Sequence, residues 1–295
     1  MQGPTAPRRR RPRPAEERGL TIAVRARSDD HDGVQPPPAQ EPFYVPVGEE
    51  IAIFEACHAR RLPVMLKGPT GCGKTRFVEH MAWRLKRPLV TVACHEDLAA
   101  SDLVGRYLVR ATETVWQDGA LTRAIRASAL CYLDEVVEAR QDIVVVIHPL
   151  TDDRRLLSID KTGELLQAGP DFQLVVSYNP GYQHVLKDLK PSTRQRFVAL
   201  DFGFPPADVE IRIVAHESGV DPDTAHFLVG LAVRLRTLRD RGLAEVPSTR
   251  LLVAAARLIA SGIPARHACR TAIAAPLSDE PELLAAVHDV IDTVV

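Results

Sequence analysis

The sequence lacks the motifs that identify several large classes of protein. Its ten histidines show no HExxH or comparable ligand spacing and its five cysteines form no CxxC pair, so we expect reduced thiols and no protein-held transition metal. No apolar run approaches the ~20 residues that span a bilayer, and no hydrophobic signal segment opens the sequence. We therefore expect a cytoplasmic chain without membrane insertion. A formal net charge of −1 also disfavours a generally basic surface that binds nucleic acid.

The first 41 residues have few large apolar side chains and differ in composition from the rest. Residues 1–40 carry eight arginines against five acidic residues, a local charge of +3 that leaves −4 for residues 41–295. Such a segment cannot bury enough surface to offset the entropy of ordering it, so we expect a disordered, basic and proline-rich arm. The arm is either a solvated tail or a contact for nucleic acid or an acidic partner.

A glycine-rich loop lies between an expected strand and an expected helix. Residues 68–75, GPTGCGKT, match the Walker A pattern GxxxxGK[ST] without a mismatch. The apolar run Leu62 to Leu66 predicts a buried strand before the loop, and Phe77, Met81 and Leu85 recur at helical spacing after it. The strand, loop and helix come in the order that the motif requires, whereas a chance glycine-rich turn needs no such flanks.

Each residue type in this loop suits the phosphates of ATP. The glycines let the backbone turn tightly and bring its N–H groups against phosphate oxygens, next to a helix N-terminus that favours negative charge. Lys74 supplies a cation for the β and γ phosphates, and the Thr75 hydroxyl is a ligand for Mg²⁺. The predicted nucleotide-binding residues are Gly68, Pro69, Thr70, Gly71, Cys72, Gly73, Lys74 and Thr75.

An acidic pair ends a later apolar run. A second strand is expected over Pro88 to Ala93, and the third, over residues 129–135, ends in Asp134 and Glu135. We predict that Asp134 holds the Mg²⁺ shell and that Glu135 orients and deprotonates the attacking water. Such a pair can simply cap a strand, but its position about 60 residues after the Walker A loop favours a Walker B element.

Polar residues suited to phosphoryl transfer also lie beside two further expected strands. The strand Gln173 to Tyr178 ends at Asn179, whose amide can hydrogen-bond both the γ-phosphate and the lytic water, although Asn-Pro alone is a turn signal. Arg194 and Arg196 precede the strand Val198 to Phe202. A guanidinium there can stabilise charge on a transferring phosphoryl group, and the alternative for either arginine is an ordinary surface position.

After Phe202 the pattern changes to helices. Two apolar stripes at helical spacing, expected to be core, are Leu228, Leu231, Leu235, Leu238 and the run Leu251 to Ile259. Arg250 opens the second of these helices and is placed to face the nucleotide. We therefore expect three regions: the disordered arm over residues 1–41, an α/β ATPase domain over 42–204 and a helical domain over 205–295.

Seven segments carry a family resemblance. They are LPVMLKGPTGCGKTRFVEHMAWRL, SDLVGRY, CYLDEVVEARQD, VIHPLTDDRR, SYNPGYQ, KDLKPSTRQRF and PSTRLL. From about residue 41 to its end, the chain resembles the CbbQ/NirQ/NorQ branch of the MoxR group of AAA+ ATPases. The resemblance implies an α/β fold, an AAA+ P-loop NTPase core with a five-stranded parallel sheet, followed by a small all-α lid domain. It also implies a helix at Ile143 to Ile147, where five consecutive β-branched residues by themselves favour a strand.

The resemblance assigns roles to the residues outside the two Walker elements. Asn179 matches sensor 1 and Arg250 the sensor 2 arginine, while Arg194 and Arg196 occupy the arginine-finger region. An arginine finger enters the site of the neighbouring subunit, which implies a homo-oligomeric ring, typically a hexamer. Insertions are expected at Leu103 to Leu121 and, as a hairpin, at Arg155 to Ala168; such insertions usually contact substrates and partners.

The function implied by the resemblance is ATP-driven, Mg²⁺-dependent remodelling of a target enzyme. The work is shared with a von Willebrand factor A-domain (VWA) partner of the CbbO/NorD type. The target is rubisco blocked by sugar phosphates for CbbQ-like members and nitric oxide reductase for NirQ/NorQ-like members, and the motifs do not separate the two. An AAA+ transcriptional regulator or a DNA-associated ATPase is the alternative, although residues 101–119 contain no GAFTGA loop and the body of the chain is acidic.

Overall fold

The computed structural model describes residues 33–110, 113–180, 189–238 and 245–294. The arm expected over residues 1–41 therefore lies mostly outside the described residues. Its last part is described, and there the backbone of Gln35 exchanges two hydrogen bonds of 2.9 Å with Leu89, in an isolated antiparallel bridge on an edge strand. Residues 33–41 thus include a backbone contact with the sheet, within the segment expected to be part of the arm. Composition could not indicate this, because backbone pairing depends little on side chains.

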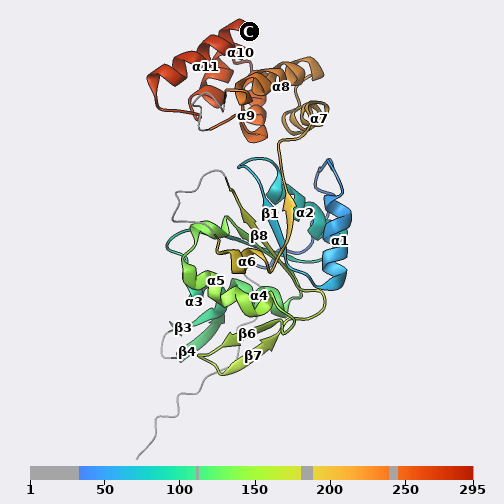
Figure 1. The fold of residues 1–295 in the computed structure, drawn as a ribbon, viewed down its shortest axis with the longest axis vertical. Helices are drawn as coiled ribbons and strands as arrows, with labels where there is room; N and C mark the ends of the chain where they lie inside the picture. Colours follow the sequence, from blue (N-terminus) through green and yellow to red (C-terminus); the bar gives the residue numbers. More distant parts are fainter. Residues whose placement is uncertain (1–32, 111–112, 181–188, 239–244, 295) are drawn as a thin grey trace, which may run out of the picture.

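Five parallel strands form the central sheet (Figure 1). They are β1 (Val64–Lys67), β2 (Leu89–Ala93), β5 (Leu130–Asp134), β8 (Gln173–Tyr178) and β9 (Val198–Asp201). The order is β2-β5-β8-β1-β9, so β1 pairs with β8 on one side and β9 on the other. The expected five-stranded parallel sheet is confirmed, with strand ends that shift by one or two residues. Because the strands are parallel, the residues that follow β1, β5 and β8 meet at one edge.

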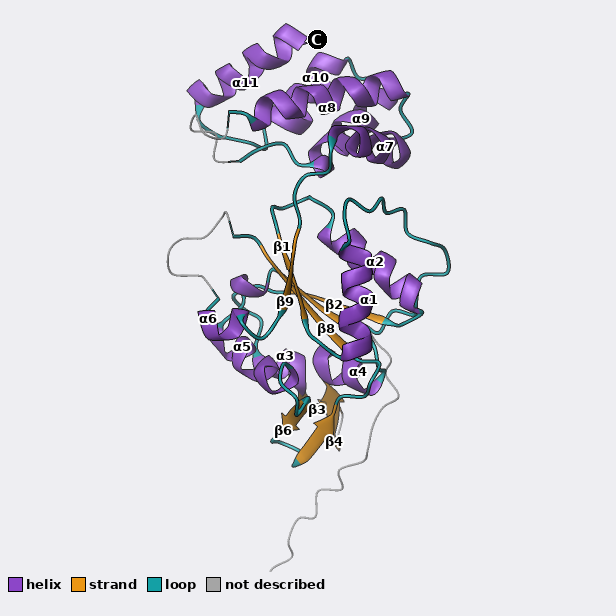
Figure 2. Ribbon diagram, turned by 45° about the vertical axis from the view of Figure 1, so that its right-hand side comes forward, coloured by secondary structure: helices purple, strands orange, loops and turns teal. Residues whose placement is uncertain are grey.

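Helices cover both faces of this sheet (Figure 2). They are α1 (Glu50–Arg60), α2 (Lys74–Leu85), α4 (Ala120–Arg126) and α5 (Gln141–Ile147). Leu66 and Tyr132 pack with α1 and α2 on one face, while Met65 and Leu133 pack with α4 and α5 on the other. Burial on both faces explains why the strands are continuous apolar runs rather than alternating ones.

The β-branched run Ile143 to Ile147 is helical, as the family resemblance implied, and forms most of α5. Ile143 and Ile147 are buried, whereas Val145 between them is 65% exposed. This is the spacing of one helix face, and burying two isoleucines against the sheet outweighs the modest helix-disfavouring effect of β-branching.

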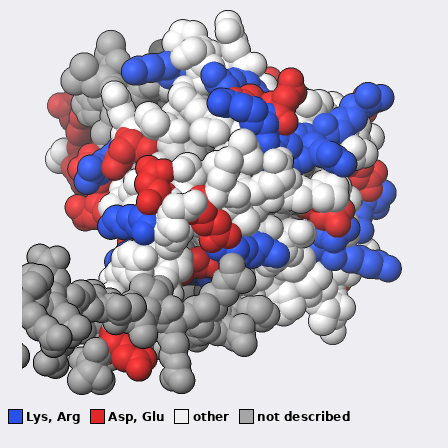
Figure 3. Space-filling model, turned by 90° about the horizontal axis from the view of Figure 1, so that it is seen from below, with Lys and Arg blue, Asp and Glu red and all other residues white. Residues whose placement is uncertain are grey.

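Two β-hairpins extend from the end of the sheet that lies away from the C-terminal helices (Figure 1). The first is β3 (Gly105–Arg110) and β4 (Glu113–Asp118) after the short α3 (Ala100–Val104), and the second is β6 (Leu156–Ile159) and β7 (Glu164–Gln167). Both occupy the positions expected for insertions, and Tyr107 Oη donates to the Lys161 carbonyl at 3.3 Å between them. Figure 3 shows this end, where basic side chains lie beside acidic ones over the visible part of the face.

The C-terminal part is helical and has a core of its own. Its helices are α7 (Ala207–Ser218), α8 (Pro222–Arg236), α9 (Thr249–Ala260), α10 (Ala265–Cys269), the π-helical η4 (Arg270–Ala274) and α11 (Pro281–Val294). Leu228, Leu231 and Leu235 are fully buried in this core, which confirms the expected stripe. The α8 N-terminus is fixed by Asp221, whose carboxylate accepts the Thr224 N–H at 2.9 Å. Among the described helices, none has the length and apolarity needed to cross a membrane.

Candidate nucleotide-binding site

The Walker A loop joins β1 to α2, and its glycines are required by close contacts at Gly68 and Gly71 and by a positive φ at Gly73. Gly68 has φ +157°, and a Cβ there would lie 2.1 Å from the Phe202 carbonyl oxygen. Gly71 has φ +72°, and a Cβ there would lie 2.7 Å from the Ser248 side chain. Gly73 has φ +100° with open space beside it, and it precedes the first residue of α2. The loop therefore packs against β9 and α9 while leaving a cradle at the α2 N-terminus.

Lys74 is the buried cation of this loop. Its ammonium donates to the carbonyls of Gly68 at 2.7 Å and Pro69 at 2.9 Å, so the side chain folds back over the loop. The neighbouring Cys72 thiol is also buried, and burial raises its pKa, which keeps it a neutral thiol beside the cradle. The positive charge of Lys74 is thus held where phosphate oxygens would meet the backbone N–H groups.

The Asp134 carboxylate ends β5 and is held by two hydroxyls. Tyr132 Oη donates to Asp134 Oδ1 at 2.6 Å, and Ser177 Oγ donates to the same oxygen at 2.5 Å. Burial, and then the neighbouring Asp134 charge, raises the pKa of Tyr132, so the phenol remains a donor. Both hydroxyls come from buried strand positions, so the carboxylate has a fixed place at the edge of the sheet.

Glu135 follows with an unusual backbone conformation. Its φ of 57° and ψ of 47° lie in the left-handed region, which costs energy for a residue with a side chain. The Glu135 N–H donates to Ser177 Oγ at 2.9 Å, so one serine of β8 contacts both acidic residues. Sequence reasoning missed Ser177, because a lone serine inside an apolar strand has no distinguishing pattern.

A cavity of about 1010 Å³ brings most of the predicted residues together. Those that line it are Thr70, Gly71, Cys72, Gly73, Lys74, Thr75, Asp134, Glu135 and Arg250. Its walls come from both parts of the chain, because Ile213 and Val253 of the helical part also line it. Asn179 lies beside the loop, with its Nδ2 3.4 Å from Thr70 Oγ1.

The two arginines near β9 are placed elsewhere. Arg194 ends the short α6 (Pro191–Arg194), and Arg196 Nη1 lies 3.9 Å from Asp152 Oδ2. Neither arginine is among the described residues that line the cavity. The structure thus brings the Walker residues, Asn179 and Arg250 to one place and leaves Arg194 and Arg196 outside it.

Apolar side chains that were not predicted also line the cavity. Val45, Val47 and Ile53 line it from the segment before α1 and from α1 itself. Glu50 holds this segment: its carboxylate accepts the Tyr44 hydroxyl at 2.8 Å and the N–H groups of Val47 and Gly48 at 2.9 and 2.8 Å. Burial alone would raise the pKa of Glu50, but these hydrogen bonds lower it below its ordinary value.

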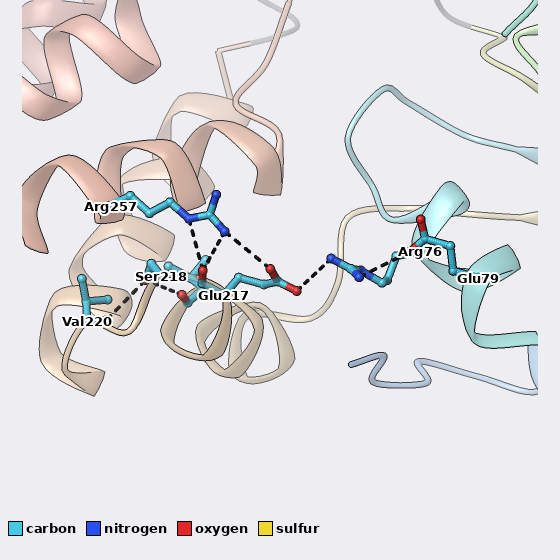
Figure 4. Close-up of polar contacts among 7 residues, drawn as sticks. Arg76, Glu79, Glu217, Ser218, Val220 and Arg257 are labelled. Carbon is cyan, nitrogen blue, oxygen red and sulfur yellow. Dashed lines mark hydrogen bonds and ion pairs between the residues drawn. The ribbon is translucent and has the colours of Figure 1, made fainter. Parts of the chain in front are cut away.

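Ionic and aromatic contacts join the two parts of the chain at the rim of the cavity. Arg76 of α2 donates to Glu217 of α7 at 3.2 Å, and Arg257 of α9 donates to the Glu217 carbonyl at 2.9 Å (Figure 4). One residue earlier, the His216 ring stacks on Phe43 with centroids 3.6 Å apart. The C-terminal end of α7 is therefore attached to both α2 and the segment before α1.

The chemistry of this arrangement suits a nucleoside triphosphate with a divalent cation. The open space at Gly73 and the ammonium of Lys74 suit phosphates. The Asp134 carboxylate and the Thr75 hydroxyl are hard oxygen ligands of the kind that Mg²⁺ prefers. The apolar side chains of Val45, Val47 and Ile53 in the cavity lining suit the flat face of a base.

Comparison with known proteins covers both parts of the chain. Residues 63–197 match the family model of the AAA domain (dynein-related subfamily), and residues 210–294 match that of the CbbQ/NirQ/NorQ C-terminal region. Protein CbbQ of Hydrogenophilus thermoluteolus is 61% identical, over 82% of this chain and 91% of that protein. Protein NorQ of Paracoccus denitrificans is 60% identical, over 84% of this chain and 92% of that protein. Denitrification regulatory protein NirQ of Pseudomonas aeruginosa is 61% identical, over 85% of this chain and 96% of that protein.

Proposed function

The chain belongs to the CbbQ/NirQ/NorQ family of AAA ATPases, and from this membership we propose that it couples Mg²⁺-dependent ATP hydrolysis to the remodelling of a target enzyme. The observation that carries the ATPase assignment is the convergence of Lys74, Asp134 and Glu135 on one cavity. A phosphate-binding cation, a metal-ligand carboxylate and a candidate base occupy a single site, which is what phosphoryl transfer to water requires.

In this proposal the residues divide the work of hydrolysis. Lys74 and the loop N–H groups bind the β and γ phosphates. Glu135 accepts a proton from the water that attacks the γ-phosphate, and Asn179 orients that water. Thr75 and Asp134 would hold Mg²⁺, which neutralises charge on the phosphates. Arg250, which lines the cavity from the helical part, would contact the γ-phosphate.

The catalytic arginine would come from a neighbouring subunit. Arg194 and Arg196 lie outside the cavity of their own chain, and Arg196 is near Asp152 instead. A homo-oligomeric ring, typically of six subunits in this family, would bring α6 of one subunit to the cavity of the next. Each site would then be complete only in the assembly.

The target enzyme and its partner are proposed from the family resemblance. The names CbbQ, NorQ and NirQ all occur among relatives about 60% identical to this chain, so identity does not choose between rubisco and nitric oxide reductase. We propose that a VWA-domain partner of the CbbO/NorD type delivers the target. The β3–β4 and β6–β7 hairpins, at the end of the sheet away from the C-terminal helices, are the proposed contacts with partner or target.

A reactivation assay tests this function. The chain and its VWA partner would be added with ATP to rubisco blocked by a sugar phosphate and, separately, to inactive nitric oxide reductase. We expect recovery of one of these activities with the unmodified chain and none with Lys74→Ala, which loses phosphate binding. Equal recovery with Lys74→Ala would contradict ATP-driven remodelling, and genes for one of the two targets next to this gene would identify the right assay.

A further inference from the structure

A fully buried carboxylate lies inside the helical part, outside the site described above. Glu210 of α7 is 0% exposed and accepts three hydrogen bonds. Arg236 Nη1 donates to Glu210 Oε2 at 2.7 Å and Arg236 Nη2 to Oε1 at 2.8 Å, a bidentate pair from α8. Thr249 Oγ1, in the first turn of α9, donates to Oε1 at 2.6 Å. The cluster thus joins three helices through one side chain.

Arg236 extends this cluster to the chain segments that border the cavity. Its Nε donates to the Pro247 carbonyl at 2.9 Å, just before α9. Its guanidinium carbon lies 3.9 Å from the centre of the Phe204 ring, in the segment that connects β9 to α7. Phe204 itself lines the cavity. One guanidinium therefore holds both the connecting segment and the entrance to α9.

The first turn of α9 is the part of the helical region that meets the phosphate loop. The Ser248 side chain lies so close to Gly71 that a Cβ on the glycine would be 2.7 Å away. Arg250 lines the cavity, and Thr249, bound to Glu210, lies between these two residues. A displacement of this turn would therefore move Ser248 and Arg250 together.

The need for folding alone does not explain a buried ion pair at this place. Removing two charges from water is costly, and apolar residues of similar volume often stabilise a core as well or better. The hydrogen bonds to Glu210, however, fix the relative orientation of the three helices that they join, which apolar packing leaves free. A charged cluster at this position is explained if the orientation of the α9 first turn matters to the reaction.

We propose that Glu210 and Arg236 are positioning residues for ATP hydrolysis, which hold the first turn of α9 so that Ser248 packs on the phosphate loop and Arg250 faces the γ-phosphate. The proposal rests on the proposed ATPase function and adds two residues that do not touch the nucleotide. Through Phe204 and Pro247, the same pair makes the connecting segment and Arg250 move as one unit.

The decisive variant replaces the ion pair by apolar residues, Glu210→Leu with Arg236→Met. We expect a melting temperature within a few degrees of the parent, a KM for ATP within about threefold, and a kcat at least about tenfold lower. Adding Arg250→Ala to this variant should lower kcat no further, although Arg250→Ala alone should lower it in the parent. The control is Arg270→Gln with Asp292→Asn, a 2.6 Å pair in the same helical part that lies outside the cavity lining, which should leave kcat unchanged.

A smaller change keeps the test valid if the double variant does not fold. Thr249→Val removes only the hydroxyl that binds Glu210 and should lower kcat. Thr249→Ser keeps this hydroxyl and should have the kcat of the parent. A folded double variant, or a folded Thr249→Val variant, with the kcat of the parent would overturn this proposal alone. Absence of ATP turnover in the parent would overturn the proposed function, and this proposal with it.

Discussion

At the scale of single residues, Glu135 shows how a strained backbone serves a site. Its left-handed conformation places the side chain at the cavity rather than along the line of β5. The Ser177 hydroxyl accepts its N–H and at the same time donates to Asp134, so the turn between the two acidic residues is fixed from β8. Strain of this kind persists where surrounding contacts determine it, and it is common at active sites.

Glu135→Gln should separate binding from hydrolysis. The amide keeps the shape of the side chain but cannot accept a proton from water, so kcat should fall by about 10²–10⁴-fold while ATP affinity changes little. Rapid-quench turnover and a fluorescent-nucleotide titration measure the two effects. The matched control, Glu138→Gln, changes a nearby carboxylate outside the cavity and should keep normal turnover. Normal turnover in Glu135→Gln would mean that another residue is the base.

Ser177→Ala should weaken both the fold and the site. It removes a buried donor to Asp134 and the acceptor of the Glu135 N–H, so the free energy of unfolding should fall by about 1–3 kcal/mol. Magnesium-dependent nucleotide binding should weaken as well, because Asp134 loses one of its two hydroxyl contacts. Ser158→Ala removes an exposed hydroxyl bonded to Asp160 and should cost about 0.5 kcal/mol or less. Equal losses in denaturant melts of the two variants would contradict this role for Ser177.

The residues that sequence could predict are those whose spacing forms a motif. Gly71 and Lys74 lie in an eight-residue pattern, and Asp134 follows it at a typical distance. Ser177 and Glu210 act through contacts with segments far away in the chain, and nothing in their neighbours marks them. Their roles follow only from the fold.

At the scale of elements, the Arg76–Glu217 contact ties α2, which begins at Lys74, to α7 of the helical part (Figure 4). The two side chains are 45% and 23% exposed, so solvent screens the pair and its contribution is modest. Because both residues line the cavity, that contribution should appear in nucleotide affinity.

Arg76→Ala, Glu217→Ala and the double variant should each weaken ATP binding by about two- to fivefold, with the double no worse than either single change. Isothermal titration with a non-hydrolysable ATP analogue measures the affinity. The control pair Arg84 and Glu55 joins α2 to α1 at 2.6 Å outside the cavity lining, and its alanine variants should bind normally. Additive losses for Arg76 and Glu217 would show that they act separately.

Sequence patterns predicted the core strands to within two residues because burial on both faces leaves long apolar runs. For residues 143–147, local propensity predicted a strand, which is wrong, and the family resemblance predicted a helix, which is confirmed. The helix is favoured because it buries Ile143 and Ile147. The Gln35–Leu89 bridge was missed because it is made by backbone atoms in a segment of loop-like composition.

At the scale of the whole molecule, the proposed ring has a kinetic signature. ATPase activity per subunit should rise with protein concentration as rings assemble, followed in parallel by size-exclusion light scattering. The reason is that Arg194 or Arg196 would act on the cavity of a neighbour rather than on its own. A concentration-independent rate from a monomer would exclude a shared site.

Mixing two inactive variants should restore activity if the arginine acts across an interface. Glu135→Gln subunits keep the finger, and subunits with the finger arginine changed to alanine keep the base. In a one-to-one mixture, about a quarter of the interfaces combine an intact cavity with an intact finger, so about a quarter of the parent rate should return. Of Arg194→Ala and Arg196→Ala, only the variant of the true finger should be inactive alone and rescued here. A mixture that gives the mean of the separate rates would contradict transfer across the interface.

The short segment over residues 202–206 carries the covalent connection from β9 to α7, and the cavity beside it has walls from both sides. A molecule bound in the cavity is held by the sheet and by the helices at once. It therefore acts as a second, removable connection between the sheet domain and the helical part. The stiffness of the chain under tension should therefore depend on what the cavity holds. If the helices are pulled away from the sheet, the force needed to separate them should be highest with intact triphosphate bound. That force should drop when the γ-phosphate leaves. Each turnover should therefore change the mechanical compliance of the chain.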